Sequence, residues 1–116
     1  MIRMHNLLHD LKSNLVLEHD EDDLMLRGYL TAAIDYAESY QHREPEYYDV
    51  HAMSASTRQA VLLLASHFYE SRDGSTAGFF GDGVEAGRNV WKTVNALLDM
   101  GKEWVVGYAD FGTQHA

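Results

Sequence analysis

The stretch that decides the fold is Arg58-Gln59-Ala60-Val61-Leu62-Leu63-Leu64-Ala65-Ser66-His67-Phe68-Tyr69-Glu70. One helix face collects Val61, Leu62, Ala65, Phe68 and Tyr69, and Leu63 and Leu64 extend the apolar surface around most of the circumference. Ser54 or Ser56 suits its start, because a serine side chain accepts a hydrogen bond from a free N–H of the first turn. A helix that is apolar nearly all round must be covered on several sides, so we expect it at the centre of the domain or in a subunit contact.

Three further segments show the helical spacing of apolar residues. Residues 6–15 carry Leu7, Leu8, Leu11 and Leu15 at intervals of three and four, with Asn6 as the capping residue. A second helix is expected from about Asp20 to Tyr40, with an apolar stripe of Leu26, Leu30, Ala33, Ile34, Ala37 and Tyr40. Another, from about Val84 to Leu98, directs Val90, Trp91, Val94, Leu97 and Leu98 inward, and Gly101 is close enough to end it. The pattern predicts an all-α fold, a small bundle of about four helices with a C-terminal arm.

A chain of 116 residues fits one domain, and we divide it into a helical domain over residues 1–101 and an arm over 102–116. The polar stretch from Gln41 to Asp49, which holds the only proline, is expected to connect two helices. Ser71 to Gly83 is a second, glycine-rich connection. The arm carries Trp104, Tyr108 and Phe111, which expose more apolar surface than a free tail should carry. They either pack on their own domain or contact a partner.

The charge of the chain disfavours a conventional DNA-binding domain. The net charge is −9, with 18 acids against nine Lys and Arg, and the excess of acids lies in the first half. Tight binding to a phosphate backbone needs clustered Lys and Arg, and the sequence has no such cluster. There is no cysteine, no apolar run long enough for a membrane helix and no apolar stretch typical of a signal peptide. We therefore expect a soluble, intracellular protein.

No motif in the sequence supports catalysis or a bound cofactor. Asp20, Asp22 and Asp23 suggest a calcium loop, but Met25 and Thr31 stand where an EF-hand requires glycine and glutamate. These acids instead predict a helix start, where they accept free backbone N–H groups and oppose the positive end of the helix dipole. The seven histidines include no H-E-x-x-H pair, residues 78–83 lack the Lys-Ser/Thr of a phosphate loop, and no nucleophile elbow is present. We expect no catalytic residue, no metal and no cofactor.

Three stretches together resemble the head–tail connector family of tailed bacteriophages and prophages, whose members are often labelled DNA-packaging proteins. Leu11 to Leu24 resembles the family's opening, a short helix followed by the acidic start of a long helix. Ala32 to Tyr40 resembles the end of that long helix, and Arg58 to Arg72 is similar to the family's R-x-A-[IV]-L-L-L-x-x-H-[WF]-Y-E-x-R helix, the most specific of the three. The resemblance covers about residues 7–98. The chain departs from the family by lacking its prolines before the third stretch and after Leu98.

The resemblance implies a structural role in a ring of identical helical subunits below the portal protein of the phage head. DNA would pass through the centre without tight binding, and tail or stopper proteins would dock on the far side. It places the protein in the host bacterial cytoplasm during assembly and at the virion head–tail junction. An acidic channel wall would repel phosphates, and the candidate channel-facing acids are Glu21, Asp22, Asp35 and Glu38. The candidate assembly contacts are Leu63, Leu64, Trp104, Tyr108 and Phe111.

Two other functions remain open at this point. A packaging-motor accessory, or another small helical module that contacts DNA directly, would show a basic patch once folded. A small metal-dependent hydrolase would hold zinc when purified.

Overall fold

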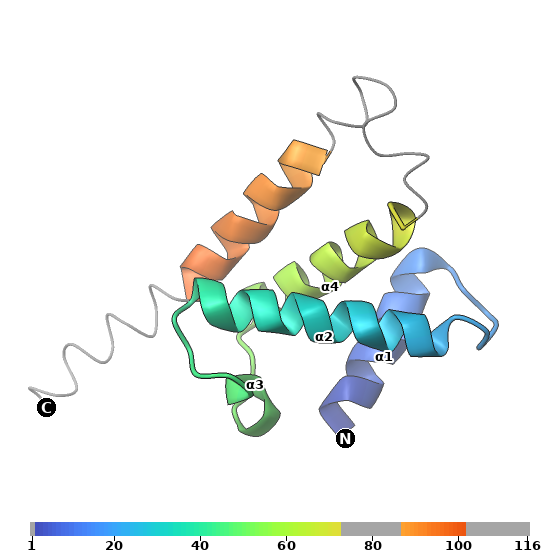
Figure 1. Cartoon of the computed structure of the whole chain (residues 1–116), viewed down its shortest axis with the longest axis horizontal. Helices are drawn as coiled ribbons and strands as arrows, with labels where there is room; N and C mark the ends of the chain where they lie inside the picture. The colour runs from blue at the N-terminus through green and yellow to red at the C-terminus, as the bar shows by residue number, and fades with distance from the viewer. Residues whose placement is uncertain (1, 73–86, 102–116) are drawn as a thin grey trace, which may run out of the picture.

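The computed structural model describes residues 2–72 and 87–101, and every regular element within these ranges is an α-helix. The helices are α1 (Ile2–Leu15), α2 (Asp23–Tyr40), α3 (Tyr47–Val50), α4 (Ala55–Glu70) and a helix over residues 87–101 (Figure 1). The predicted all-α fold is confirmed. One difference is α3, a single helical turn that begins inside the predicted connection from Gln41 to Asp49 and ends one residue beyond it. None of these described helices is long and apolar enough to cross a membrane.

The centre of the bundle is α4, which packs mainly against α2. In Figure 1, α2 crosses in front of α4, α1 lies against both, and the helix over residues 87–101 approaches the C-terminal end of α2. The fully buried large side chains come from all four of these helices: Leu7, Leu11, Leu26, Leu30, Leu64, Leu98, Val61 and Val94. Ile34 and Phe68 pack against this core from its edge, and Leu62 and Ala65 lie within it.

Burial inside the bundle corrects one of the predicted assembly contacts. The side chain of Leu64 is only 1% exposed and belongs to the domain's own core. Leu63 is half-buried against the same core. Because α1, α2 and the helix over 87–101 supply the cover that α4 needs, the all-round apolar surface of α4 reflects its central position in the domain. Leu64 is therefore not available to a neighbouring subunit.

The helix starts differ from the sequence prediction at two of three positions. Helix α1 already includes Ile2, so Asn6 lies inside it and does not cap it. Helix α2 begins at Asp23, and the side chain of its N-cap residue, Asp22, makes no capping hydrogen bond. Helix α4 begins at Ala55 as expected, and the hydroxyl of Ser54 accepts a hydrogen bond of 3.1 Å from the N–H of Thr57.

Gly101, the last described residue of the helix over 87–101, has a packing role. It is still helical, and a Cβ atom there would lie 2.6 Å from Thr57 Oγ1 and 2.8 Å from Gln41 Nε2. Only a residue without a side chain lets the end of the helix over 87–101 approach the start of α4 so closely.

Tyrosines on α2 hold the other side of the helix over 87–101. The hydroxyl of Tyr36 donates to Asn95 Oδ1 at 2.7 Å, and its ring meets the Trp91 ring edge-on with centroids 5.1 Å apart. One turn further along, a hydrogen bond to Asp99 raises the pKa of Tyr40. These contacts fix the helix over 87–101 along the second half of α2.

Candidate assembly sites

A buried carboxylate pins the connection between α2 and α4. Glu38 is 4% exposed, and its two oxygens accept hydrogen bonds from the N–H groups of Glu46 at 3.1 Å and Tyr48 at 2.9 Å. These N–H groups lie at the start of α3, where a short helix leaves its first donors without helical partners. Glu46 has a left-handed backbone with φ 67°, so the chain reverses sharply here. The prediction that Glu38 faces a DNA channel is wrong, because the side chain is buried and both of its carboxylate oxygens accept hydrogen bonds from the same chain.

Gln41 joins three elements at one buried point. It follows α2 directly and is 3% exposed. Its Nε2 donates to Thr57 Oγ1 at 2.9 Å and to the carbonyl oxygen of Leu98 at 3.0 Å, and its Oε1 accepts from the hydroxyl of Tyr48 at 2.5 Å. A buried amide with its polar atoms satisfied in this way fixes geometry strongly, because breaking any one bond leaves a buried polar group unpaired.

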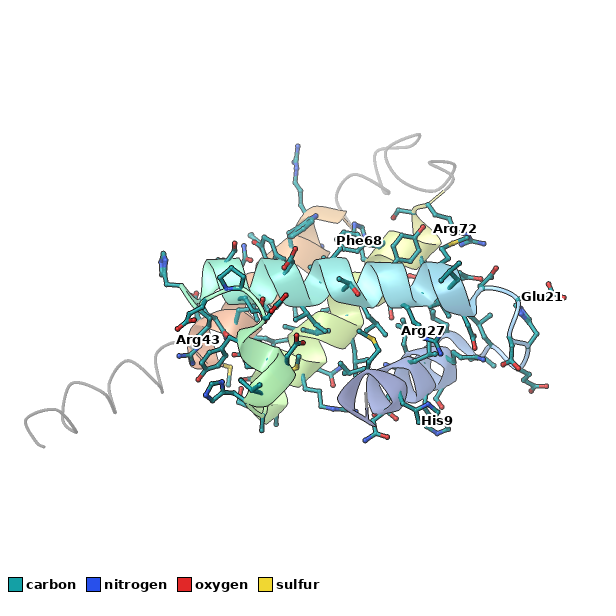
Figure 2. The ribbon with its side chains drawn as sticks, turned by 60° about the horizontal axis from the view of Figure 1, so that its bottom comes forward. His9, Glu21, Arg27, Arg43, Phe68 and Arg72 are labelled. Carbon is teal, nitrogen blue, oxygen red and sulfur yellow. The ribbon has the colours of Figure 1, made fainter. Side chains whose placement is uncertain are left out.

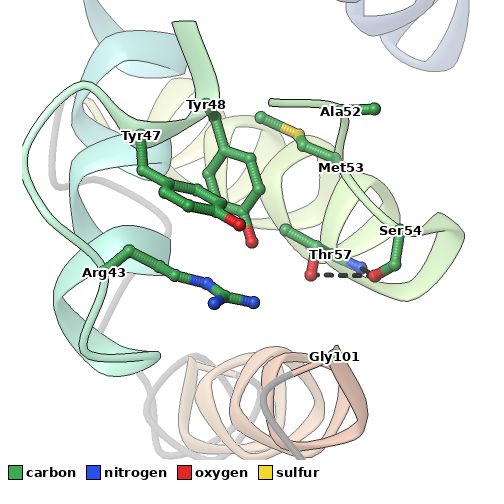
Figure 3. A pocket seen from close by; sticks show the side chains of 8 residues that line it. All are labelled: Arg43, Tyr47, Tyr48, Ala52, Met53, Ser54, Thr57 and Gly101. Atoms are coloured by element: carbon green, nitrogen blue, oxygen red, sulfur yellow. Dashed lines mark hydrogen bonds between the residues drawn. The ribbon is translucent and has the colours of Figure 1, made fainter. Parts of the chain in front are cut away.

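Beside this network lies a pocket of about 260 Å³ (Figure 3). It is lined by Arg43, Tyr47, Tyr48, Ala52, Met53, Ser54, Thr57 and Gly101, which include one cation and no carboxylate. The guanidinium of Arg43 lies over the Tyr47 ring, 4.6 Å from its centroid, and extends into the pocket beneath the two tyrosine rings. Its buried Nε atom has no hydrogen-bond partner among the described residues. The space suits one side chain rather than a cofactor, since small-molecule pockets typically measure about 300–1,000 Å³.

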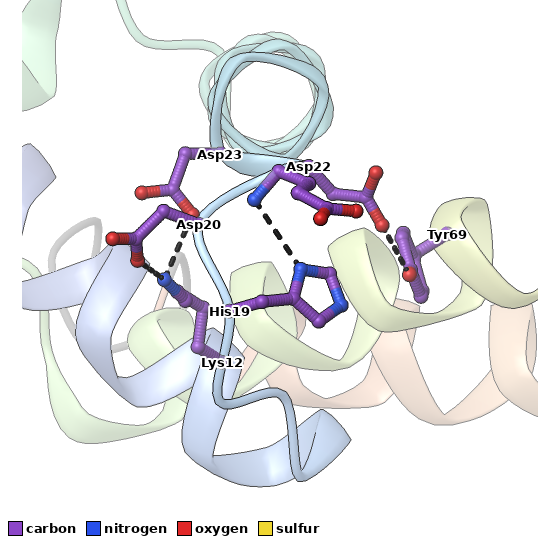
Figure 4. A network of polar contacts seen from close by, with 7 residues as sticks. Lys12, His19, Asp20, Asp22, Asp23 and Tyr69 are labelled. Carbon is purple, nitrogen blue, oxygen red and sulfur yellow. Dashed lines mark hydrogen bonds and ion pairs between the residues drawn. The ribbon is translucent and has the colours of Figure 1, made fainter.

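At the other end of α2, the acidic turn connects α1 to α2 through specific bonds (Figure 4). Lys12 Nζ lies 2.6 Å from Asp20 Oδ1 and 2.8 Å from Asp23 Oδ1. The hydrogen bonds to Asp20 and Asp23 raise the pKa of Lys12, and the bond to Lys12 lowers the pKa of Asp20. These two acids therefore tie the start of α2 to α1.

The third acid of the turn contacts α4. Asp22 Oδ2 accepts a hydrogen bond of 2.6 Å from the hydroxyl of Tyr69, and this bond raises the pKa of Tyr69 (Figure 4). Within the turn, the N–H of Glu21 donates to His19 Nδ1 at 3.2 Å. The predicted role of these acids as caps of α2 is replaced by side-chain bonds that hold α1, α2 and α4 together.

The predicted channel-facing acids do not form one surface. Glu21 and Asp35 are exposed, Asp22 is half-buried against Tyr69, and Glu38 is buried. Glu21 lies at the tip of the turn that precedes α2 (Figure 2). The predicted contacts Trp104, Tyr108 and Phe111, and the glycine-rich residues 78–83, lie outside the described residues.

Exposed large apolar side chains gather at the two ends of α2. Val16 and Leu24, which flank the acidic turn, are 79% and 81% exposed, and Met25 follows them. Val50 at the end of α3 is 76% exposed, and Met100, the neighbour of Gly101 on the pocket wall, is 59% exposed. Sequence reasoning missed all of these, because a single apolar residue carries no periodic signal.

The described residues offer no grouping of three or more His, Asp or Glu side chains that could hold a metal ion. His67, the histidine of the most specific motif, packs its ring near those of Phe68 and Trp91, with centroids 6.4 Å away in both cases. The polar clusters described above bind residues of their own chain.

The sequence was compared with protein families, with curated proteins and with solved structures. The sequence model of one family, described as phage gp6-like head-tail connector protein, matches residues 5–104. No curated protein and no solved structure matches the chain.

Proposed function

This chain belongs to the phage gp6-like head–tail connector family, and from that membership we propose that it is the repeating subunit of a ring that joins the portal protein to the tail. Its role as a structural component of the head–tail junction follows from the family. The observation that carries the finer proposal is the match over residues 5–104, which includes every described helix beyond the first turn of α1. The shape of the bundle supports it, because exposed apolar side chains at two different ends suit a subunit with a neighbour on each side.

We place DNA in the centre of this ring, passing without tight binding. The net charge of −9 opposes capture of a duplex. Lys12 and Arg58 are paired with carboxylates, and Arg72 lies over the ring of Tyr69, so these three cations have partners inside the fold. Of the candidate wall acids, Asp35 is the one we retain, because it is exposed midway along α2.

We assign residues 102–116, with Trp104, Tyr108 and Phe111, to contacts with a neighbouring subunit or a tail protein. Leu63, half-buried on α4, is the remaining candidate from that helix. A chain truncated after Gly101 should keep the helical domain and assemble less well. If the truncated chain unfolds, residues 102–116 belong to the core and the division into domain and arm is wrong.

The direct test of the ring is the mass of the purified protein in solution, followed by electron microscopy of any large species. A single large oligomer with cyclic symmetry, or a ring that forms when purified portal protein is added, is the expected result. A closed two-fold dimer that ignores portal protein would contradict the proposal, because a two-fold contact uses one surface on both copies and cannot extend into a ring.

A further inference from the structure

The two ends of α2 differ in chemistry. We call the region of Val16, Glu18, Glu21 and Leu24 the turn end, and the region of the pocket with Val50 and Met100 the pocket end. Figure 2 shows Glu21 and Arg43 at opposite extremes of the described bundle. Eighteen helical residues separate the two regions, which corresponds to about 27 Å of helix. Large apolar side chains are exposed at both ends, Val16, Leu24 and Met25 at one and Val50 and Met100 at the other, and the ends differ in the charged groups near them.

The pocket itself is lined by a cation and no anion, and the exposed acids of the pocket end, Glu44, Glu46 and Asp49, are not part of its lining. The guanidinium of Arg43 makes no hydrogen bond or ion pair with the described residues, and it lies over the face of the Tyr47 ring. An arginine without an anionic partner leaves hydrogen-bond donors unused, since the planar guanidinium is matched best by a carboxylate. The pocket also contains Ser54 at the N-terminus of the 16-residue α4, where the helix dipole favours a negative charge. The pocket is therefore set up for a carboxylate that the described part of the chain does not supply.

At the turn end, two carboxylates have no cation partner among the described residues. Lys12 is shared by Asp20 and Asp23, and Asp22 is bonded to Tyr69. The side chains of Glu18 and Glu21 are exposed and make no hydrogen bond or ion pair with the described residues. Val16 and Leu24 stand exposed beside them. Exposed apolar residues close in sequence to a carboxylate complement exposed apolar residues close in sequence to a pocket that holds an arginine.

We propose that the turn end of one copy docks on the pocket end of the next, with the Glu21 carboxylate entering the pocket and pairing with Arg43. Val16 and Leu24 then cover Val50 and Met100. This contact rests on the proposed ring and names its interface. It is heterologous, with different surfaces meeting, and such contacts repeat until the rotation closes a ring.

The alternative pairings leave Arg43 without a carboxylate. Turn end against turn end brings Glu18 and Glu21 against their own copies, and like charges that face each other across an interface are repelled. Pocket end against pocket end leaves both Arg43 side chains without a carboxylate. Head-to-tail docking is the arrangement in which both unpaired groups find partners.

Charge reversal tests the pairing in the full chain. Arg43→Glu and Glu21→Arg should each weaken association by about 10- to 100-fold, measured by sedimentation over a concentration series. The double variant should recover most of the loss, because it restores an opposite pair. Asp35→Arg is the matched control, since it reverses an exposed acid of α2 away from both ends, and it should leave association unchanged. Equal losses in Asp35→Arg and Glu21→Arg, or no recovery in the double variant, would overturn the pairing.

Cysteine cross-linking gives a second readout that tolerates a weak contact. The chain has no cysteine, so each introduced thiol is unique. Leu24→Cys mixed with Val50→Cys should form a mixed disulfide-linked dimer under mild oxidation, and the Leu24→Cys/Val50→Cys double variant should form a ladder of covalent multimers. Leu24→Cys mixed with Asp35→Cys is the control and should link no faster than random collision. Links formed mainly between two Leu24→Cys copies would overturn the head-to-tail contact.

The two readouts separate failure of the interface from failure of the ring. Suppose the wild-type chain forms a ring, the charge-reversal variants form the same ring, and cysteines at positions 24 and 50 do not cross-link. That result leaves the proposed function standing and refutes this interface. A wild-type chain that neither forms large oligomers, with or without portal protein, nor cross-links at these positions refutes both.

Discussion

The substitution Glu38→Gln tests the buried network most sharply, because it changes one atom and removes one acceptor. Both carboxylate oxygens of Glu38 are used, Oε1 by the N–H of Glu46 and Oε2 by the N–H of Tyr48. A glutamine offers one carbonyl oxygen and one NH₂ group. One of the two backbone donors would therefore face another donor inside the protein.

The size of the effect follows from two opposing terms. A hydrogen bond to a charged group contributes about 1.5–3 kcal/mol, and a buried donor left unpaired costs about 1–3 kcal/mol. Against this, a neutral amide avoids the cost of holding a charge away from water, which is why replacing buried ions is sometimes tolerated. The Tyr48 donor is buried and held in place by α3, so it cannot turn to water, and the loss should dominate. We expect a net destabilisation of about 2–3 kcal/mol, which corresponds to a drop in Tm of roughly 8–12 °C for a chain of this size.

The assay is chemical denaturation followed by circular dichroism, with Asp35→Asn as control. That substitution makes the same chemical change one turn earlier on the exposed side of α2, where surface substitutions usually stay within about 0.5 kcal/mol. Amide hydrogen exchange adds a local measurement, since the N–H groups of residues 46 and 48 should lose protection ahead of the core. If Glu38→Gln and Asp35→Asn have the same stability, the carboxylate is not holding the connection and the reasoning fails.

Three further outcomes are expected. Gly101→Ala should destabilise the protein by roughly 1–3 kcal/mol, because the new Cβ would overlap Thr57 Oγ1. Gly28→Ala, whose Cβ would have nothing within 4 Å, should stabilise α2 by about 0.5–1 kcal/mol. Denaturation experiments in which both substitutions changed stability in the same direction would contradict the packing described. Leu62→Ala should cost about 2–5 kcal/mol, and a loss under roughly 0.5 kcal/mol would show that Leu62 is not in the core. The purified protein should bind duplex DNA with a Kd above about 10⁻⁴ M at physiological salt in an anisotropy titration; micromolar binding that weakens steeply with added salt would favour a DNA-contacting packaging accessory.

Periodicity predicted the helices well where the apolar stripe was long. The extent of α4 follows from its apolar run and from the serine at position 54. The start of α2 was placed too early because acids before a helix were assumed to cap it. Here Lys12 and Tyr69 compete for those acids, and neither is adjacent to them in the sequence. Contacts between distant residues of this kind cannot be obtained from local patterns.

The buried polar residues could have been suspected in part. Glu38 lies one turn beyond Ile34 and two beyond Leu30, so it continues the apolar stripe of α2. A charged residue on a core stripe requires buried donors, which the neighbouring connection supplies. The partners of Gln41 were beyond prediction, because two of them come from α4 and from the helix over 87–101. The pocket could not be predicted for the same reason, since its wall forms only when the α3 region, the start of α4 and the end of the helix over 87–101 meet.

The buried network and the pocket are physically linked, and that link bears on assembly. The N–H of Arg43 donates to the carbonyl oxygen of Glu38 at 2.8 Å, so Arg43 emerges from the same turn that the Glu38 carboxylate holds in place. Gln41 bonds to Tyr48 and Thr57, both of which line the pocket. A pocket fixed before docking loses less conformational freedom on association than one that must be ordered, and this raises affinity without any new contact. Glu38, which the sequence suggested as a channel-facing acid, thus acts on the proposed interface indirectly. It holds Arg43 in position for the carboxylate of another copy.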